Sequence, residues 1–136
     1  MRRVLLDTGP LVALLSNADS SHIKCVEVWS ALEPPLVTCW PVLTEAAWLL
    51  RSNPSLVEGM LTAGTGGLFK ILALNEEDGA AIAGILARYR RLKPQLADAA
   101  LVHLAGREGI DTVFTLDRRD FSVYRISGMR PFRILP

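Results

Sequence analysis

A chain of 136 residues is long enough for one domain whose folding buries about two thirds of the surface that the unfolded chain exposes. Half of the residues are hydrophobic and the net charge is only +1, but no apolar run approaches the roughly 20 residues that span a bilayer. Together with the lack of a signal segment, this excludes a membrane protein and leads us to expect a cytoplasmic protein with a single domain over residues 1–136. Cys25 and Cys39 lack the spacing of a metal site or redox motif, so we expect reduced, apolar side chains.

Short apolar runs alternate with helical patterns along the whole chain. First-turn prolines favour helices that begin near Pro10, Pro41 and Pro54. In chain order we predict a strand over residues 3–6, helices over 10–15 and about 20–32, a strand over 36–39, helices over 41–52 and 54–64, a strand over 68–72, helices over 76–91 and 96–107, and strands over 112–115 and 132–135. The glycine-rich residues 64–67 lack the ending of a phosphate-binding loop and predict a flexible connection instead.

This alternation of strands and helices predicts an α/β fold with a short, mainly parallel central sheet and helices on both faces. Parallel sheets bind ligands at the carboxyl ends of their strands. Asp7 and Asp117 directly follow predicted strands, and Glu45 and Asp98 lie in or near the first turns of helices that meet the same edge. We therefore expect these carboxylates together at one edge of the sheet.

Each of these acids interrupts an apolar stretch, and a carboxylate is rarely buried unless another group compensates its charge. Four of them together favour a metal site. Asp98 is the strongest candidate, because a helical period of 100° per residue places it beside apolar Val102 and opposite Arg107. A structural hydrogen bond stays an alternative for Glu45, and capping of the following turn is an alternative for Asp7 and Asp117.

Other polar and aromatic residues are expected to be structural. The acidic residues 76–78 suit the first turn of a helix and are interpreted as surface residues that the helix dipole favours. His22 and His103 are interpreted as structural or solvated. The tryptophans are expected in the core rather than at an interface: Trp29, Trp40 and Trp48.

Positive charge is concentrated in the second part of the chain. Residues 1–87 hold 5 Lys and Arg against 9 Asp and Glu, whereas residues 88–136 hold 10 against 5. Cations precede Asp98 and follow Asp117 in the sequence, and they are Arg88, Arg90, Arg91, Lys93, Arg118 and Arg119. This placing favours a site that holds a polyanion near a metal, although an ordinary solvated surface explains the charge pattern equally well.

The segments VLLDTGPLVALL, TEAAWLL, LADAALVHLA and TLDRRDF, with the terminal FRILP, together resemble the PIN-domain ribonucleases and, within them, the VapC-type toxins of toxin–antitoxin pairs. The resemblance covers nearly the whole chain. It places the acidic residues of the family on the four acids described above and its small hydroxyl residue, near the metal, on Thr115. Asp120 is a fifth acid beside this site and is either auxiliary or the cap of a turn.

The resemblance implies an endoribonuclease that hydrolyses RNA with a water activated by Mg²⁺ or Mn²⁺. Hard carboxylate oxygens suit these ions, and histidine or cysteine ligands for zinc are lacking at suitable spacing. Asp7, Asp98 and Asp117 would hold the metal, Glu45 would orient a water, and the six cations would hold the RNA backbone. A homodimer, and a small antitoxin whose tail covers the acidic edge, are implied by the resemblance alone. The target RNA and the number of metal ions stay open.

Four other interpretations were considered. The Asp-Thr-Gly sequence at residues 7–9 also occurs in aspartic proteases, but those enzymes are nearly all β and leave Glu45 and Asp98 unexplained. A haloacid-dehalogenase-like phosphatase requires a second Asp where this chain has Gly9. A catalytically silent PIN-fold binding or scaffold protein stays open, as does a stand-alone RNA-processing nuclease without an antitoxin.

Overall fold

A five-stranded parallel sheet forms the centre of the protein, whose computed structural model describes residues 2–136. Its strands are β1 (Val4–Leu6), β2 (Leu36–Thr38), β3 (Phe69–Ile71), β4 (Thr112–Phe114) and β7 (Arg133–Leu135), in the spatial order β3-β2-β1-β4-β7. Leu5 in β1 lies opposite Val37 on one side and Val113 on the other. The predicted α/β fold with a mainly parallel sheet is confirmed.

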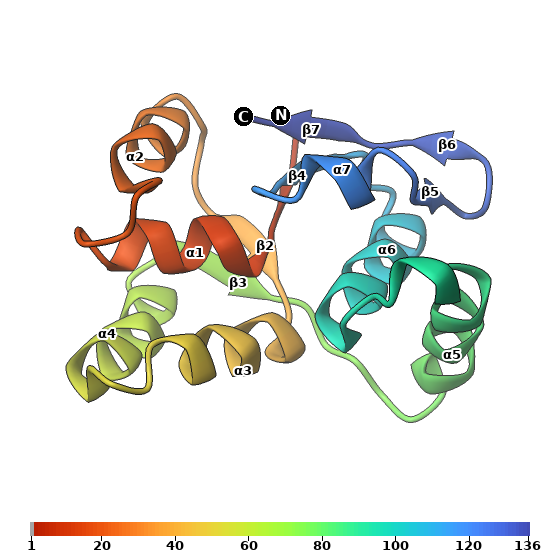
Figure 1. Cartoon of the computed structure of the whole chain (residues 1–136), viewed down its shortest axis with the longest axis horizontal. Helices are drawn as coiled ribbons and strands as arrows, with labels where there is room; N and C mark the ends of the chain where they lie inside the picture. The colour runs from red at the N-terminus through yellow and green to blue at the C-terminus, as the bar shows by residue number, and fades with distance from the viewer. Residues whose placement is uncertain (1) are drawn as a thin grey trace.

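Helices lie on both sides of this sheet, as predicted, with α1 and α2 on one side and α5 and α6 on the other (Figure 1). The helices are α1 (Thr8–Leu15), α2 (His22–Ser30), α3 (Trp40–Leu49), α4 (Pro54–Thr65), α5 (Asp78–Arg88), a short 3-10 helix η1 (Arg90–Leu92), α6 (Leu96–Glu108) and α7 (Arg118–Phe121). Of the helices in residues 2–136, none is long and apolar enough to cross a bilayer.

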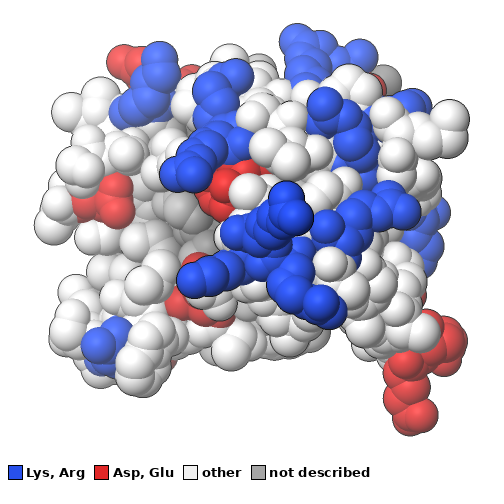
Figure 2. Space-filling view, turned by 45° about the vertical axis from the view of Figure 1, so that its right-hand side comes forward, with Lys and Arg blue, Asp and Glu red and all other residues white. Residues whose placement is uncertain are grey.

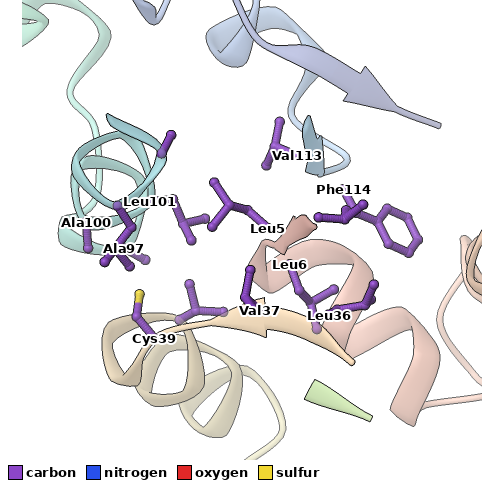
Figure 3. Close-up of a cluster of buried hydrophobic side chains, with 14 of the residues drawn as sticks. Leu5, Leu6, Leu36, Val37, Cys39, Ala97, Ala100, Leu101, Val113 and Phe114 are labelled. Atoms are coloured by element: carbon purple, nitrogen blue, oxygen red, sulfur yellow. The ribbon is translucent and has the colours of Figure 1, made fainter. Parts of the chain in front are cut away.

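The core includes residues of α1 to α4, such as Leu11 and Met60, and one part of it lies between the sheet and helix α6. Figure 3 shows Leu5 and Val113 of the central strands facing Leu101 and Ala97 of this helix. A fully buried leucine contributes roughly 1.5–3 kcal/mol to the stability of the fold. Most of the buried α6 residues are small, which lets the helix approach the sheet closely: Ala97, Ala99, Ala100, Leu101, Val102, Leu104 and Ala105. Such packing fixes the first turn of α6 relative to the strand ends.

Several predicted boundaries differ from the structure. Helix α1 begins at Thr8 rather than Pro10, and α5 begins at Asp78 and ends at Arg88, so the predicted helix over residues 76–91 is too long at both ends. Helix α7 and the antiparallel pair β5 (Arg125–Ile126) and β6 (Arg130–Pro131) were not predicted. These elements are two to four residues long, too short for a periodic pattern to develop.

The interpretation of Asp78 as a surface residue is wrong. Its side chain is buried and joins α5 to α6, because Oδ1 lies 2.7 Å from Nε2 of His103 and Arg107 donates from 3.3 Å. The backbone N–H of Asn75 donates to Oδ2 at 2.7 Å. This backbone hydrogen bond, followed by the one from His103, lowers the pKa of Asp78 to about 2. His103 is therefore structural, one of the two roles expected for it.

The expectation that the tryptophans lie in the core is wrong for two of them. Trp40 is 56% exposed and Trp48 is 63% exposed, because α3 turns Val42 and Ala46 toward the core instead. The guanidinium of Arg51 lies 3.8 Å from the ring centre of Trp48. Both cysteines are buried and unpaired, in agreement with the sequence analysis.

Candidate functional site

The four predicted acids line one open hollow of about 400 Å³. It lies at the carboxyl ends of β1 and β4, where the chain connections leave in opposite directions across the sheet. Ligands of open α/β sheets bind at such a point. The residues around the hollow are Asp7, Thr8, Gly9, Glu45, Leu49, Gln95, Asp98, Leu116 and Asp117.

Asp7 is the most deeply buried of the acids, with 6% of its surface exposed. Its backbone N–H donates to the carbonyl of Phe114 at 3.0 Å, which continues the pairing of β1 with β4 and fixes the position of Asp7. The side chain accepts hydrogen bonds from the backbone of Thr8 at 2.8 Å and from the hydroxyl of Thr115 at 2.6 Å. Burial outweighs these bonds and, with the charges of Asp98 and Glu45, raises the pKa of Asp7 to about 7.

Thr115 connects the ends of the two central strands. Its hydroxyl donates to Oδ2 of Asp7 and accepts the backbone N–H of Asp117 at 3.0 Å. One buried side chain therefore sets both the orientation of Asp7 and the direction in which the chain leaves β4.

Glu45 reaches the hollow from the second turn of α3. Its Oε1 accepts the hydroxyl of Thr8 at 3.1 Å, and the backbone N–H of Thr8 donates to Asp7. Thr8 thus holds two of the acids at once. The structural hydrogen bond considered for Glu45 is present, and Glu45 also lines the hollow.

Asp98 lies in the first turn of α6 and forms a capping box with Gln95. Its Oδ2 accepts the backbone N–H of Gln95 at 2.9 Å, which satisfies one of the free donors at the start of the helix. Burial, with the charges of Glu45 and Asp117, nevertheless raises the pKa of Asp98 to about 6. The raised pKa therefore reflects the burial of this carboxyl first and the neighbouring carboxylates second.

Asp117 caps the short helix α7, because its Oδ1 accepts the backbone N–H of Asp120 at 3.1 Å. The capping role considered for Asp7 and Asp117 is therefore also present. Asp120 lies beside the site, where partial burial and the charge of Asp117 raise its pKa. It extends the negative potential of the hollow without lining it.

A divalent cation fits the chemistry of this donor set. The hollow offers carboxylate oxygens, which are hard ligands, and burial together with the neighbouring carboxylates raises the pKa values of Asp7 and Asp98. Within residues 2–136, however, no three acidic, histidine or cysteine side chains lie close enough to form a ready-made metal cluster. Cation binding would therefore require rotations of these side chains.

Sequence reasoning missed Thr8 and Gln95, which line the hollow, and Tyr124, a buried residue that does not line it. The first two have a local signal, since Thr8 directly follows Asp7 and Gln95 stands three residues before Asp98, as a capping box requires. Tyr124 has no such signal. It is fully buried, its hydroxyl has no hydrogen-bond partner among residues 2–136, and burial followed by the charge of Asp98 raises its pKa.

A family model of the PIN domain matches residues 4–126 of this sequence. The chain belongs to the PIN domain family. Ribonuclease VapC26 of Mycobacterium tuberculosis is 28% identical to it over 135 residues, which cover 98% of this chain and all of that protein. This bears out the resemblance to PIN-domain ribonucleases of the VapC type.

Two solved structures share the fold of this PIN domain. VapC20 of Mycobacterium tuberculosis, described as a sarcin-ricin loop cleaving toxin, superposes with a TM-score of 0.81 at 21% identity over 94% of this chain and 99% of that one. The DNA-bound VapBC of Salmonella typhimurium gives a TM-score of 0.63 at 20% identity over 99% of this chain and 98% of that one. At these identities the likeness concerns the fold alone.

The predicted RNA-binding cations of this PIN domain are all exposed: Arg88, Arg90, Arg91, Lys93, Arg118 and Arg119. The first four lie at the end of α5 and around η1. Arg118 is partly engaged, because its guanidinium donates to the backbone carbonyls of Ile134 and Pro136. Figure 2 shows acidic side chains in a recessed part of one face, with many Lys and Arg side chains beside them.

Proposed function

We propose that this PIN domain is a metal-dependent endoribonuclease and the toxin of a VapBC-like toxin–antitoxin pair. The observation that carries the proposal is the hollow in which four carboxylates from separate parts of the chain meet, two of them with strongly raised pKa values. Uncompensated carboxylates at the carboxyl edge of a parallel sheet suit a cation that acts on a phosphodiester. The name of the relative VapC26, a ribonuclease, supports the same activity.

The proposed ligands of Mg²⁺ or Mn²⁺ are Asp7, Asp98 and Asp117. A bound cation of this kind supplies a water of lowered pKa and neutralises charge that develops on the phosphodiester. Thr8 and Thr115 hold Asp7 by hydrogen bonds, so its carboxylate keeps one orientation while the others adjust. Glu45, held by Thr8, orients the attacking water, whose oxygen forms the new bond to phosphorus as the ribose oxygen leaves.

The substrate of this proposal is RNA, held by the cations beside the hollow. Arg90, Arg91 and Lys93 are exposed on and after η1, and Arg119 lies on α7 next to the acids. Contacts of this kind follow the phosphate backbone and weaken as salt increases. Unpaired RNA suits an open but recessed site because its backbone bends into it more easily than a duplex does.

The proposed partners are a second copy of the chain and a small antitoxin. The fold shared with the DNA-bound VapBC of Salmonella typhimurium supports an antitoxin partner. An antitoxin tail that covers the acidic hollow would block the access of RNA to the carboxylates.

The test is cleavage of a labelled pool of structured RNA with Mg²⁺, Mn²⁺ or EDTA. Glu45→Gln and Asp98→Asn should abolish an activity that the native protein shows only with a divalent ion. Glu27→Gln is the matched control, because Glu27 is exposed on α2 and lies outside the hollow. This variant should cleave RNA as the native protein does. Activity that survives EDTA or Asp98→Asn would contradict the proposal.

A catalytically silent PIN-fold binding protein is the second candidate. The observation in its favour is the lack of a ready-made metal cluster within residues 2–136. It predicts that the folded protein binds RNA but cleaves none of the pools with either ion. A stand-alone RNA-processing nuclease would instead cleave RNA and have no antitoxin gene beside its own.

A further inference from the structure

A second pocket, of about 490 Å³, lies between α5, α6 and the turn that joins β5 to β6. No residue lines both this pocket and the acidic hollow. Three arginines and a histidine contribute to its wall and no acidic side chain does, and the polar or charged lining residues are Arg88, Tyr89, His103, Arg107, Arg125 and Ser127. The pocket is therefore positive in a protein whose net charge is only +1.

Arg88 is the free charge of this pocket. Within residues 2–136 no acidic side chain lies at ion-pair distance from it. Its guanidinium packs on Gly128, where an added Cβ would lie 2.5 Å from Nη1. Gly128 also has φ +74°, a conformation that side chains rarely adopt. The turn thus leaves space for the guanidinium that no other residue type would leave.

Arg125 is held rigidly at the same pocket. Its Nη1 donates to the backbone carbonyls of Ser122 at 2.8 Å, Val123 at 3.2 Å and Tyr124 at 3.0 Å, which leaves its other donors available. Arg107 differs, because Asp78 and Glu108 neutralise it. Two guanidinium groups, one free and one fixed by the backbone, therefore supply the uncompensated charge.

We propose that this pocket, formed by Arg88, Arg125 and the turn at Gly128, binds a backbone phosphate of the RNA at a distance from the bond that is cut. Guanidinium groups match phosphate oxygens in shape and charge. The inference rests on the proposed function for the identity of the ligand. Along α6, Gly106 at the pocket lies about 12 Å from Asp98 at the hollow, from the rise of a helix, so one strand reaches both places.

The test is the binding of a labelled single-stranded RNA in EDTA, measured by fluorescence anisotropy over a series of salt concentrations. Arg88→Ala should weaken binding several-fold and reduce the slope of log K against log salt by about 0.7, the value for one phosphate of a single strand. Arg88→Lys should keep the slope. The control is Arg133→Ala, because exposed Arg133 lies at the amino end of β7, away from the hollow, and should leave the slope unchanged.

A glycine pair separates position from charge. Gly128→Ala keeps every charge but displaces the guanidinium of Arg88, so it should weaken RNA binding as Arg88→Ala does. Gly109→Ala is the control for backbone strain, because Gly109 has φ +68° but open space around an added Cβ. Melting temperatures of both variants show whether each is folded, and equal RNA binding by two folded variants would overturn the proposal.

The EDTA condition keeps this test independent of cleavage. Arg88-dependent binding with no cleavage under Mg²⁺ or Mn²⁺ would support the phosphate pocket while the nuclease proposal fails. Native-like RNA binding by Arg88→Ala would overturn the pocket even in an active nuclease. A titration with inorganic phosphate, monitored by NMR, tests whether the pocket binds free phosphate instead of an RNA phosphate. Phosphate binding that depends on Arg88, without any effect of Arg88→Ala on RNA binding, would overturn the assignment of RNA as the ligand.

Discussion

Thr115 shows how one hydroxyl sets the chemistry of a neighbouring acid. Its hydrogen bond to Asp7 lowers the pKa that burial raises, so the value of about 7 is a balance between the two effects. Without the hydroxyl, Oδ2 of Asp7 would lose the hydrogen bond from Thr115, and the carboxyl would stay protonated over more of the neutral pH range. The same hydroxyl accepts the N–H of Asp117, so two proposed metal ligands depend on it.

Thr115→Val is therefore expected to reduce cleavage about tenfold to a hundredfold at neutral pH, in line with the loss of a hydrogen bond to a charged group. The pH at which activity is half-maximal should also rise. Thr112→Val is the control, because its buried hydroxyl donates to Asp111, which lies outside the hollow. A pH profile that Thr115→Val leaves unchanged would show that this hydroxyl does not govern Asp7.

Tyr124 and Tyr89 form a second contrast at the scale of single residues. Their rings pack edge to face with centroids 5.0 Å apart. The hydroxyl of Tyr124 is buried with no hydrogen-bond partner in the described part of the chain, whereas the hydroxyl of Tyr89 accepts the backbone N–H of Arg125 at 2.9 Å. Tyr124→Phe should raise the free energy of unfolding by about 1 kcal/mol, and Tyr89→Phe should lower it by about 1 kcal/mol. Urea unfolding measures both. Destabilisation by Tyr124→Phe would reveal a partner for its hydroxyl.

At the scale of elements, the contact between α5 and α6 depends on a polar cluster that the sequence does not reveal. Asp78 belongs to an acidic triplet that a helix dipole explains, while its partners His103 and Arg107 stand in another helix. The same limit applies to the tryptophans of α3, whose exposure depends on which face α1 and α6 cover. Long helices and buried strands follow from periodicity, but contacts between helices follow from their packing.

Asp78→Asn is expected to lower the melting temperature at neutral pH and to remove part of the acid sensitivity of the fold. The pKa of Asp78 is about 2 in the folded protein against 3.8 as the ordinary value. Its contribution is therefore present above pH 3.8 and is lost as the pH falls through 2. Glu77→Gln, at an exposed neighbouring position, should change neither property. Thermal melts across this acid range compare the two variants.

At the scale of the whole molecule, the topology of the sheet explains why the acids meet. Their common edge was predicted from two facts, the alternation of strands with helices and the binding of ligands at carboxyl ends of parallel strands. What the sequence did not predict is how they are held: Thr8 joins Asp7 to Glu45, and Thr115 joins Asp7 to Asp117. Those bridges follow from the exact pairing of β1 with β4, which a residue pattern does not specify.

The crowded carboxylates should make the metal-free protein more stable in mild acid than in mild base. The folded pKa is about 7 for Asp7 and about 6 for Asp98, both above the ordinary 3.8. Between pH 3.8 and its folded pKa, each carboxyl keeps a proton in the folded state that it releases in the unfolded state. The stability that this proton contributes is therefore lost as the pH rises through about 6 for Asp98 and about 7 for Asp7. The melting temperature in EDTA should fall from about pH 5 to about pH 8, a range that leaves Asp78 fully ionised.

Divalent ions should reverse this loss, because a cation that binds only the folded state stabilises it by about 2.7 kcal/mol at a hundred times its dissociation constant. Protons compete with the cation for Asp7 and Asp98, so the rise in melting temperature with Mg²⁺ or Mn²⁺ should be larger at the higher pH. Asp7→Asn should remove the share of the pH dependence that belongs to Asp7 and most of the response to the ions. Asp111→Asn is the control, because Asp111 is partly buried but lies outside the hollow, and it should keep both properties. A melting temperature indifferent to both ions across this range would leave the raised pKa values as a consequence of burial alone and remove the main physical support for a metal site.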